Sequence, residues 1–346
     1  MKEISLVPSS GKYNIYVGEG ILSDALAASL CDKNYDRIFA VWDSNVFSLW
    51  HDYVLSEFKK IGRVIDGEHI FAAGEKNKRL DTVSEIYTAF AGANLTRRSL
   101  VVAIGGGVCG DMAGFAAATF LRGIDVLQMP TTLLSQIDSS IGGKTGVDLS
   151  VGKNLVGAFH QPIAVIADSC FLSTLPKRYM DDGMGEAIKY GCIADDELFC
   201  TIADKTINRA DRVYRCMKIK AEVVEADEFE LGVRAILNYG HTFGHAVEKL
   251  GGFERFSHGE SVGIGMLYAA RVGAALGYDG GIEPRIRGTL EAWGLPTDMD
   301  YPKEELVRVI GSDKKRVADE IKFILLDGIG KAVIKKLPIS GLGEMI

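Results

Sequence analysis

The stretch Leu100-Val-Val-Ala-Ile104, Gly105-Gly-Gly-Val-Cys-Gly110-Asp111 joins a short apolar run to a glycine-rich turn and then to an Ala- and Gly-rich segment. A strand that enters a helix through glycines predicts a pyrophosphate site, because the backbone can approach the phosphates and the helix N-terminus offers N–H groups. The turn fits G-x-G-x-x-G, but it does not lie on the first strand, and no acidic partner for a ribose hydroxyl stands about twenty positions later. The other interpretation of these glycines is a tight turn with close helix packing.

The segments on either side of this turn alternate short β-rich runs with helical patterns. Strands are expected at Ile4–Val7, Tyr13–Val17, Ile38–Trp42, His69–Phe71, Leu100–Ile104, Val126–Met129 and Ala164–Ala167. Such alternation predicts a mostly parallel sheet with helices on its faces. From Leu175 to Leu295 the pattern is almost entirely helical, and a hairpin is expected at Ile321–Leu326 and Ala332–Ile334. We therefore expect an α/β cofactor-binding domain over residues 1–174 and a mainly α-helical domain over residues 175–346.

Composition narrows the class of protein. The chain has 346 residues, 47% of them hydrophobic and 25% charged, which is typical of a globular protein. A formal net charge of −7 argues against nucleic-acid binding. Glycines and Asp111 interrupt the apolar stretch Leu100–Leu121, so this stretch is not expected to span a membrane. The charged residues Lys2 and Glu3 lie where a signal peptide would need its apolar region. We expect a cytoplasmic protein with no membrane partner, whose six cysteines are mostly reduced packing thiols.

Two further features favour a nucleotide and a phosphate. Asp43 ends the strand predicted at Ile38–Trp42, where an acid can hold a ribose or adenosine hydroxyl. The run from Asp138 to Gly146 and the following Lys153-Asn154 place lysines in Gly-flanked turns beside hydroxyls. Lysines in loops are usually only solvated, but these uncharged surroundings suit phosphate groups better. Together these features favour the cofactor interpretation of the glycine-rich turn.

Three of the six histidines, His241, His245 and His258, fall within eighteen residues. On a helix, His241, His245 and Glu248 would share one face. Neutral imidazoles with a carboxylate are the ligands of a catalytic Zn²⁺-type ion, and nearby glycines would allow close approach. A lone histidine is usually structural, but this cluster favours a metal site. Spacing does not select two of the three histidines, and it leaves three possible carboxylates, Glu186, Glu248 and Glu260.

The chain resembles the dehydroquinate synthase family over roughly residues 40–330. The resemblance rests on seven motifs in the family's order: Gly105 to Gly123, Pro130-Thr-Thr-Leu-Leu, Asp138-Ser-Ser-Ile-Gly-Gly-Lys-Thr-Gly, Gly152-Lys-Asn-Leu-Val-Gly-Ala-Phe, Gly185-Glu-Ala-Ile-Lys-Tyr-Gly, Leu237-Asn-Tyr-Gly-His-Thr-Phe-Gly-His-Ala and His258-Gly-Glu. Several such motifs in order are far more specific than any one of them. Tyr239, where Phe is common, is a mild departure.

The resemblance implies a set of site residues. Glu186, His241 and His258 would bind a divalent metal, Zn²⁺ or Co²⁺, while His245 would lie near the substrate phosphate and assist proton transfer. Around the substrate it implies Arg122, Lys144, Asn154, Lys189, Lys220, Arg234 and Asn238, with Glu230 as a proton acceptor. For NAD it implies Asp43, Gly74, Glu75, Lys76, Lys78, Gly106, Gly107, Val108, Cys109, Gly110, Asp111, Thr131, Thr132, Lys144, Lys153, Phe171, Leu172, Ser173 and Thr174. Either Lys314 or Lys315 would also contact substrate.

The reaction implied by the resemblance converts 3-deoxy-D-arabino-heptulosonate 7-phosphate to 3-dehydroquinate and phosphate. It proceeds through transient oxidation by NAD, β-elimination of phosphate, re-reduction and an intramolecular aldol closure, with no net redox. The expected partner is this anionic sugar-acid phosphate, and the expected assembly is a homodimer. Two rivals remain: a metal-dependent polyol or glycerol-phosphate dehydrogenase, and a sister sugar-phosphate cyclase that makes an inosose or a valiolone. An amino-substituted variant of the substrate also stays open. A non-catalytic binding protein would have no reason to keep both the metal-ligand residues and the glycine-rich cofactor turn.

Overall fold

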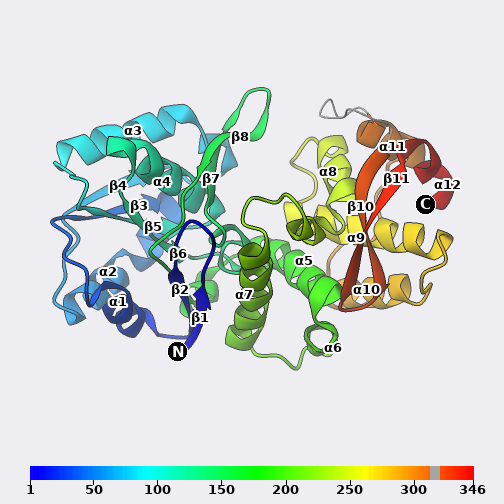
Figure 1. The fold of residues 1–346 in the computed structure, drawn as a ribbon, viewed down its shortest axis with the longest axis horizontal. Coiled ribbons are helices and arrows are strands. Elements are labelled where there is room, and N and C mark those ends of the chain that lie inside the picture. The colour runs from blue at the N-terminus through cyan, green and yellow to red at the C-terminus, as the bar shows by residue number, and fades with distance from the viewer. Residues whose placement is uncertain (312–319) are drawn as a thin grey trace. The chain divides into compact units, whose positions relative to one another are not determined.

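The computed structural model describes residues 1–311 and 320–346, which form two compact units (Figure 1). Unit 1 contains Met1–Leu175 and Arg209–Glu228. Unit 2 contains Pro176–Asn208 and Phe229–Ile346. Among the helices of the described residues, none is long and apolar enough to span a membrane.

Unit 1 is built on a sheet that, within the described residues, has seven strands in the order β1-β2-β9-β6-β5-β3-β4. The strands are β1 (Lys2–Leu6), β2 (Tyr13–Gly18), β3 (Ile38–Asp43), β4 (Gly67–Phe71), β5 (Leu100–Gly105), β6 (Asp125–Pro130) and β9 (Ala164–Asp168). Only the β1–β2 pair is antiparallel, and the other neighbours pair in parallel. The mostly parallel sheet predicted from the sequence is confirmed, and each predicted strand lies within one or two residues of an observed one.

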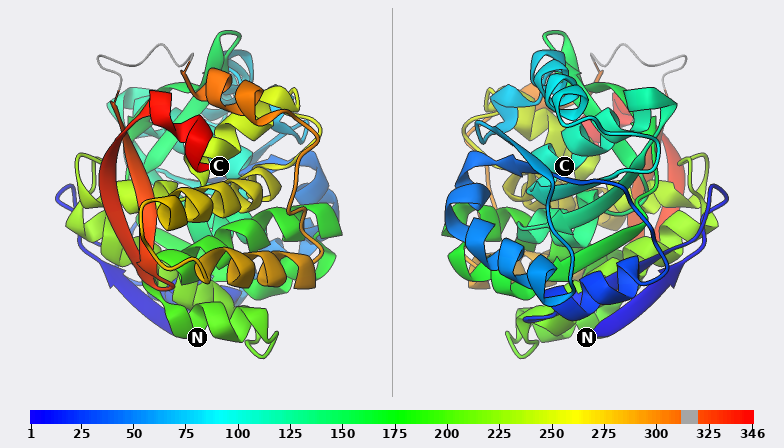
Figure 2. Two further views of the ribbon diagram at one scale, coloured as in Figure 1. Left: turned by 90° about the vertical axis from the view of Figure 1, so that its right-hand side faces the viewer. Right: turned by 90° about the vertical axis from the view of Figure 1, so that its left-hand side faces the viewer.

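Helices cover both faces of this sheet (Figures 1 and 2). They are α1 (Leu22–Leu30), α2 (Ser44–Lys60), α3 (Leu80–Gly92) and α4 (Gly107–Thr119). Along β3, Ile38, Ala40 and Trp42 pack with α1 and α2. Phe39 and Val41 point the other way and pack with α3 and α4. Because both faces are buried, the strand is a continuous apolar run and not an alternating one.

A hairpin stands where the sequence predicted Gly-flanked turns. It consists of β7 (Lys144–Leu149) and β8 (Gly152–Phe159), and β7 packs on α4. The prediction of loops for Lys144 and Lys153 is wrong, since both lie in strands. The glycines in this segment obscure the alternating pattern of a strand in the sequence. They also allow the two strands to pair closely, because a Cβ at Gly157 would come within 2.1 Å of the Thr145 carbonyl oxygen. Such close backbone approach is a usual reason for glycine inside a strand.

The helix α7 (Arg209–Ala226) changes the domain division expected from the sequence. The chain leaves unit 1 at Leu175, one residue from the expected boundary, but returns to it for Arg209–Glu228. In unit 1, α7 packs against β1 and β2, and Lys2 forms an ion pair with Asp211 at 2.5 Å. Residues 175–346 are therefore not one continuous domain. Local pattern alone identifies the helix but not its packing partner.

Unit 2 is mainly helical, as predicted. Its helices are α5 (Lys177–Ala194), α6 (Asp196–Ala203), α8 (His241–Leu250), α9 (His258–Ala275), α10 (Ile282–Ala292), α11 (Lys303–Gly311) and α12 (Leu342–Met345), with a 3₁₀ segment η5 (Val233–Asn238). The predicted hairpin is confirmed as β10 (Glu320–Gly328) and β11 (Lys331–Pro338), and β10 packs on α9. The helices and the hairpin of this unit can be followed in Figure 2.

Glycines bring the backbones of α5, α8 and α9 into contact. A Cβ at Gly259 of α9 would lie 1.8 Å from the Asp182 carbonyl oxygen of α5, and one at Gly185 would lie 2.2 Å from that of Gly259. A Cβ at Gly265 would meet the Gly240 carbonyl oxygen, just before α8, at 2.0 Å. Atoms cannot approach so closely, so a side chain at any of these positions would force the helices apart.

We expect Gly185→Ala and Gly259→Ala to destabilise the protein by more than about 2 kcal/mol, because each methyl group overlaps backbone that has no room to move. Gly288→Ala is the matched control: Gly288 also lies inside a helix, but nothing lies within 4 Å of its added Cβ. This control should gain up to about 1 kcal/mol from helix propensity alone. Thermal unfolding of the three variants measures both effects. Equal melting temperatures for Gly185→Ala and Gly288→Ala would contradict the packing argument.

Candidate active site

Helices α5, α8 and α9 bring Glu186, His241 and His258 to one point. Glu186 follows Gly185 in α5, His241 begins α8, and His258 begins α9 directly before Gly259. The Glu186 Oε1 atom lies 3.6 Å from His241 Nε2 and 3.7 Å from His258 Nε2. The three residues can each offer one ligand atom to a common ion. Of the alternatives left open by the sequence, this set contains His241, His258 and Glu186.

The Glu186 carboxylate shows that this cluster fits a metal ion. Its side chain is fully buried, and Oε1 has no hydrogen-bond partner among the described residues. An unpaired buried carboxylate oxygen is costly, and a cation between it and two imidazoles would remove that cost. The other oxygen, Oε2, forms a close ion pair with Lys189, which is also buried. Carboxylate and imidazole ligands with spare coordination positions are typical of catalytic Zn²⁺-type sites.

The outer nitrogens of the two histidines also have partners. His241 Nδ1 lies 3.2 Å from the Tyr239 carbonyl oxygen, which accepts its proton and leaves Nε2 bare. His258 Nδ1 lies 3.4 Å from Glu248 Oε1. Burial and nearby Lys189 hold the pKa of His241 well below its usual range, so its imidazole is neutral. Burial lowers the pKa of His258, but the Glu248 hydrogen bond and the Glu186 charge outweigh it and raise that pKa to about 9.

The remaining carboxylates have other roles. Glu260 is used in a capping box, where its side chain accepts from the Ser257 backbone N–H at 2.7 Å. The Ser257-x-x-Glu260 spacing was a readable signal for this cap. Glu248 is the partner of His258, a role that the sequence analysis did not identify. A second group, His245, Glu248 and His258, also has ligand geometry, but it shares His258 with the first and its His245 is exposed.

In unit 1, most residues predicted to hold NAD gather where parallel strands end. Asp43 is the last residue of β3, and β4, β5, β6 and β9 are followed by Gly74–Lys78, the glycine-rich turn, Thr131–Thr132 and Phe171–Thr174 respectively. The carboxyl ends of parallel strands meet at one edge of a sheet, which is where α/β folds bind ligands. Asp43 Oδ1 caps α2 by accepting from the Asn45 and Val46 N–H groups at 3.0 Å. Its Oδ2 lies 2.9 Å from the position of a Cβ on Gly105, so it borders the turn.

An ion-pair network links three of these segments. Lys78 is buried, and its Nζ lies 2.6 Å from Asp111 Oδ2 and 2.6 Å from Asn154 Oδ1. Lys153 lies 3.6 Å from Glu75. Burial raises the pKa of Asp111 to about 6, although the Lys78 charge opposes this rise. The structure thus joins residues of η1 (Glu75–Asn77), α4 and β8 that the sequence placed far apart.

Some predicted NAD residues face the core. Cys109 is buried and its thiol donates to the Val41 carbonyl oxygen at 3.3 Å. Phe171 packs edge-on against Trp50 with ring centroids 5.0 Å apart, and Leu172 is buried as well. Their side chains hold the scaffold, so they could serve a ligand at this edge only through their backbone. By contrast, Asp43 carries a carboxylate that borders the glycine-rich turn.

The predicted substrate residues fall into several groups. Glu230 Oε1 accepts from Asn238 Nδ2 at 2.8 Å in unit 2, and Arg234 lies buried in η5. Lys220 of α7 is buried and pairs with Asp138 at 2.6 Å. Lys144 is exposed at the start of β7, and His245 lies on α8. Lys314 and Lys315 lie outside the described residues.

Arg122 lies at the amino edge of the unit 1 sheet. It stands between the end of α4 and the start of β6. Because α4 begins at the carboxyl edge of the sheet and β6 starts at the amino edge, Arg122 lies at the edge opposite the glycine-rich turn. The segment before Lys144 reaches the same edge, because the Gly143 carbonyl oxygen accepts from the His160 N–H at 2.7 Å and His160 Nε2 lies 2.9 Å from the Ile124 carbonyl oxygen. A role for Arg122 at the substrate stays a prediction. The assignment came from motif matching alone, which carries no information about sheet direction.

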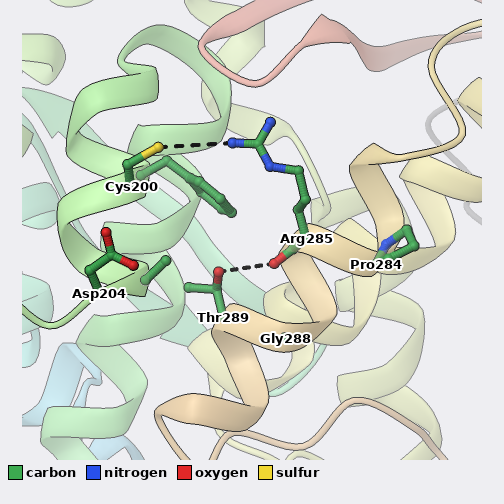
Figure 3. A pocket seen from close by; sticks show the side chains of 8 residues that line it. Cys200, Asp204, Pro284, Arg285, Gly288 and Thr289 are labelled. Carbon is green, nitrogen blue, oxygen red and sulfur yellow. Dashed lines mark hydrogen bonds between the residues drawn. The ribbon is translucent and has the colours of Figure 1, made fainter.

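A separate hollow of about 380 Å³ lies between α6 and α10 (Figure 3). It is lined by Phe199, Cys200, Ala203, Asp204, Pro284, Arg285, Gly288 and Thr289. Arg285 lies over the Phe199 ring at 5.4 Å, and its guanidinium is 3.9 Å from the Cys200 sulfur. None of these lining residues belongs to the sets predicted from the sequence.

Comparison with solved structures places the fold among NAD-binding sugar-phosphate cyclases. The chain is 27% identical to a 2-deoxy-scyllo-inosose synthase complexed with carbaglucose-6-phosphate, NAD⁺ and Co²⁺, with a TM-score of 0.86 over 99% of this chain and 98% of that one. It is 25% identical to a 2-epi-5-epi-valiolone synthase from Streptomyces hygroscopicus with NAD⁺ and Zn²⁺ bound, with a TM-score of 0.85 over 100% and 96%. A probable glycerol dehydrogenase from Sinorhizobium meliloti, at 15% identity and a TM-score of 0.63 over 96% and 95%, shares the fold alone.

Sequence comparison is more specific. The chain is 41% identical to the 3-dehydroquinate synthase of Clostridium acetobutylicum over 97% of both chains. It is 44% identical to that of Caldanaerobacter subterraneus over 86% of each. Residues 68–182 match the family model of the 3-dehydroquinate synthase N-terminal domain, and residues 183–316 match that of the C-terminal domain. The chain belongs to the 3-dehydroquinate synthase family.

Proposed function

We propose that this chain converts 3-deoxy-D-arabino-heptulosonate 7-phosphate to 3-dehydroquinate and phosphate, a carbon–oxygen lyase reaction of aromatic amino acid biosynthesis through the shikimate pathway. The observation that carries the proposal is the buried Glu186 Oε1 between two imidazoles, which has no hydrogen-bond partner among the described residues. The chain is also similar over 97% of its length to a 3-dehydroquinate synthase. Two structural neighbours at 25–27% identity are solved with NAD⁺ and Co²⁺ or Zn²⁺ bound, which supports the same cofactors here.

Glu186, His241 and His258 would hold the divalent ion, and the carboxyl edge of the unit 1 sheet would hold NAD. When bound, NAD supplies reversible oxidation of the substrate and the ion supplies Lewis-acid polarisation of its oxygens. Asp43 offers an acceptor for a ribose hydroxyl, and the glycine-rich turn offers N–H groups for the pyrophosphate. Because Lys189 neutralises one oxygen of Glu186, the other stays directed at the two histidines.

The chain's own residues would also bind and protonate the substrate. Lys144 and Asn154 would hold the phosphate, and His245 would assist proton transfer at it. Glu230, fixed by Asn238 at 2.8 Å, would accept a proton. Arg234 and Lys220 would bind the substrate carboxylate, since a planar guanidinium matches it and a lysine adds charge. A homodimeric assembly and a cytoplasmic location stay predictions.

The two rival activities differ from the proposed one in what each would consume or release. A polyol dehydrogenase would share the fold and consume NAD⁺ in proportion to product. A sister cyclase would share the cofactors and release phosphate, but from a sugar phosphate without a carboxylate. The chain is 41% identical to a 3-dehydroquinate synthase but only 25–27% identical to the two sister cyclases, which favours 3-dehydroquinate synthase activity. An amino-substituted heptulosonate stays open.

With heptulosonate phosphate, NAD⁺ and Zn²⁺ or Co²⁺, we expect phosphate release many-fold in excess of accumulated NADH, because the oxidation is reversed in each cycle. A coupled phosphate assay and absorbance at the NADH band measure both quantities in one sample. Product identification by mass then separates 3-dehydroquinate from an amino analogue. NADH build-up equal to product would support the dehydrogenase interpretation instead.

We expect Glu186→Ala, His241→Ala and His258→Ala each to lose the bound metal, since each removes one of three ligands. His245→Ala should retain the metal but lose turnover. Metal analysis after gel filtration measures this without any activity assay. Glu260→Gln is the matched control, because its carboxylate caps α9 and should not affect metal content. Loss of metal from His245→Ala together with a fully loaded His258→Ala would overturn the ligand assignment.

Arg234→Gln should lower kcat/KM for heptulosonate phosphate by about tenfold to hundredfold, because it removes a charge-assisted contact worth about 1.5–3 kcal/mol. NAD affinity should not change, and a sugar phosphate without a carboxylate should be affected much less. Arg234 is buried, so Arg212→Gln, another buried arginine, controls for lost stability. A kinetically silent Arg234→Gln, or a wild type that prefers the neutral sugar phosphate, would favour a sister cyclase.

A further inference from the structure

A buried carboxylate at the end of unit 1 gathers donors from two other segments. Glu228 lies two residues beyond α7 and is only 5% exposed. Oε2 accepts from Ser9 Oγ and from the Ser10 N–H at 3.1 Å. Oε1 accepts from Ser10 Oγ and from Gln161 Nε2 at 2.8 Å. The seryl donors come from the turn between β1 and β2, and Gln161 follows β8.

Gln161 contacts both Glu228 and Gly143, the residue before Lys144. A Cβ on Gly143 would meet the Gln161 amide at 2.8–2.9 Å, so the amide packs flat against that glycine. Gly143 has φ +67°, a conformation that favours glycine, and its carbonyl oxygen accepts from the His160 N–H at 2.7 Å. The amide is oriented by Glu228, because its Nε2 faces that carboxylate while its buried Oε1 has no hydrogen-bond partner in the part of the chain that the structure describes. Gly143 is followed directly by Lys144.

Glu228 also fixes the chain just before another proposed substrate residue. It is the last residue of unit 1, and Glu230 follows two positions later with φ +61°. A non-glycine residue in this conformation is strained and persists only where its surroundings hold it. The Glu230 side chain accepts a hydrogen bond from Asn238. The chain just before Glu230 is fixed by the four hydrogen bonds that Glu228 accepts.

We propose that Glu228 is a positioning residue for the substrate site: its carboxylate orients Gln161 against Gly143, and so sets the start of β7 at Lys144, while it anchors the chain that leads to Glu230. This inference rests on the proposed function. It assigns Glu228 no contact with substrate. These contacts require the ionised carboxylate of Glu228, because each of the four groups from Ser9, Ser10 and Gln161 donates a hydrogen bond to it. Hydrogen bonds from Ser10, Ser9 and Gln161 outweigh burial and lower the pKa of Glu228.

The Glu228–Gln161 contact can be tested by exchanging its two members. Gln161→Glu sets two carboxylates against each other where 2.8 Å now separates a donor from an acceptor. We expect this variant to lose about tenfold to hundredfold in kcat/KM for heptulosonate phosphate, because small misplacement of binding groups is costly. The double variant Glu228→Gln with Gln161→Glu restores a carboxylate facing an amide, and it should recover much of the loss. A double variant no better than Gln161→Glu overturns the proposal.

A second, milder variant covers the case in which the first fails to fold. Gln161→Ala removes only the link to Gly143 and leaves the bonds from Ser9 and Ser10. It should raise KM for heptulosonate phosphate while the dissociation constant of NAD stays unchanged. The control Asp36→Asn removes a carboxylate that accepts from Ser99 at 2.8 Å and from Thr96, before the amino end of β3. It should lower the melting temperature without changing KM. Unchanged KM in Gln161→Ala counts against the proposal.

Amide hydrogen exchange separates this inference from the proposed function. If the wild type releases no phosphate from heptulosonate phosphate, the proposed function fails. The positioning role of Glu228 still predicts faster exchange at Ser10 and over Gly142–Thr145 in Glu228→Ala than in wild type, with no such change in Asp36→Asn. Wild-type activity together with unaltered exchange in Glu228→Ala overturns this positioning role and leaves the proposed function standing.

Discussion

The close contact between the backbones of α5 and α9 is the constraint on which the metal-candidate cluster depends. Gly185 and Gly259 meet there, and the neighbouring residues in each helix are Glu186 and His258. If the helices stood farther apart, the Glu186 oxygen would lose its two imidazole neighbours and remain a buried charge with only Lys189 beside it. Glycine therefore fixes the chemistry of this site indirectly, by setting the distance between two helices that carry it.

Much of this arrangement could be predicted from the sequence because its signals are local. The strands of the parallel sheet are buried on both faces, so each is a continuous apolar run that can be recognised without its neighbours. The spacing of His241, His245 and Glu248 placed them on one helix, α8. The motif at Ser257 and Glu260 could have removed Glu260 from the three candidate carboxylates, because a capping box already assigns its side chain.

The features that the sequence did not reveal depend on partners far away in the chain. The pairing of β7 with β8 relies on glycines, which carry no strand pattern. The return of α7 to unit 1 depends on its packing against β1 and β2, about two hundred positions earlier. The placement of Arg122 at the amino edge follows from the direction of α4, which a motif match does not encode. Glu228 stood in no motif, and its donors lie at Ser9, Ser10 and Gln161.

The local charges around Glu186, His241 and His258 explain how a chain with a formal net charge of −7 suits an anionic substrate. Glu186 and Lys189 neutralise each other, and burial keeps His241 neutral. A divalent ion bound there would displace the proton from His258 and leave a net positive site in a low-dielectric surrounding. Buried Arg234 adds another fixed positive charge within the same unit. Local potential therefore opposes the overall charge, and it is the local potential that a small sugar-acid phosphate meets as it binds.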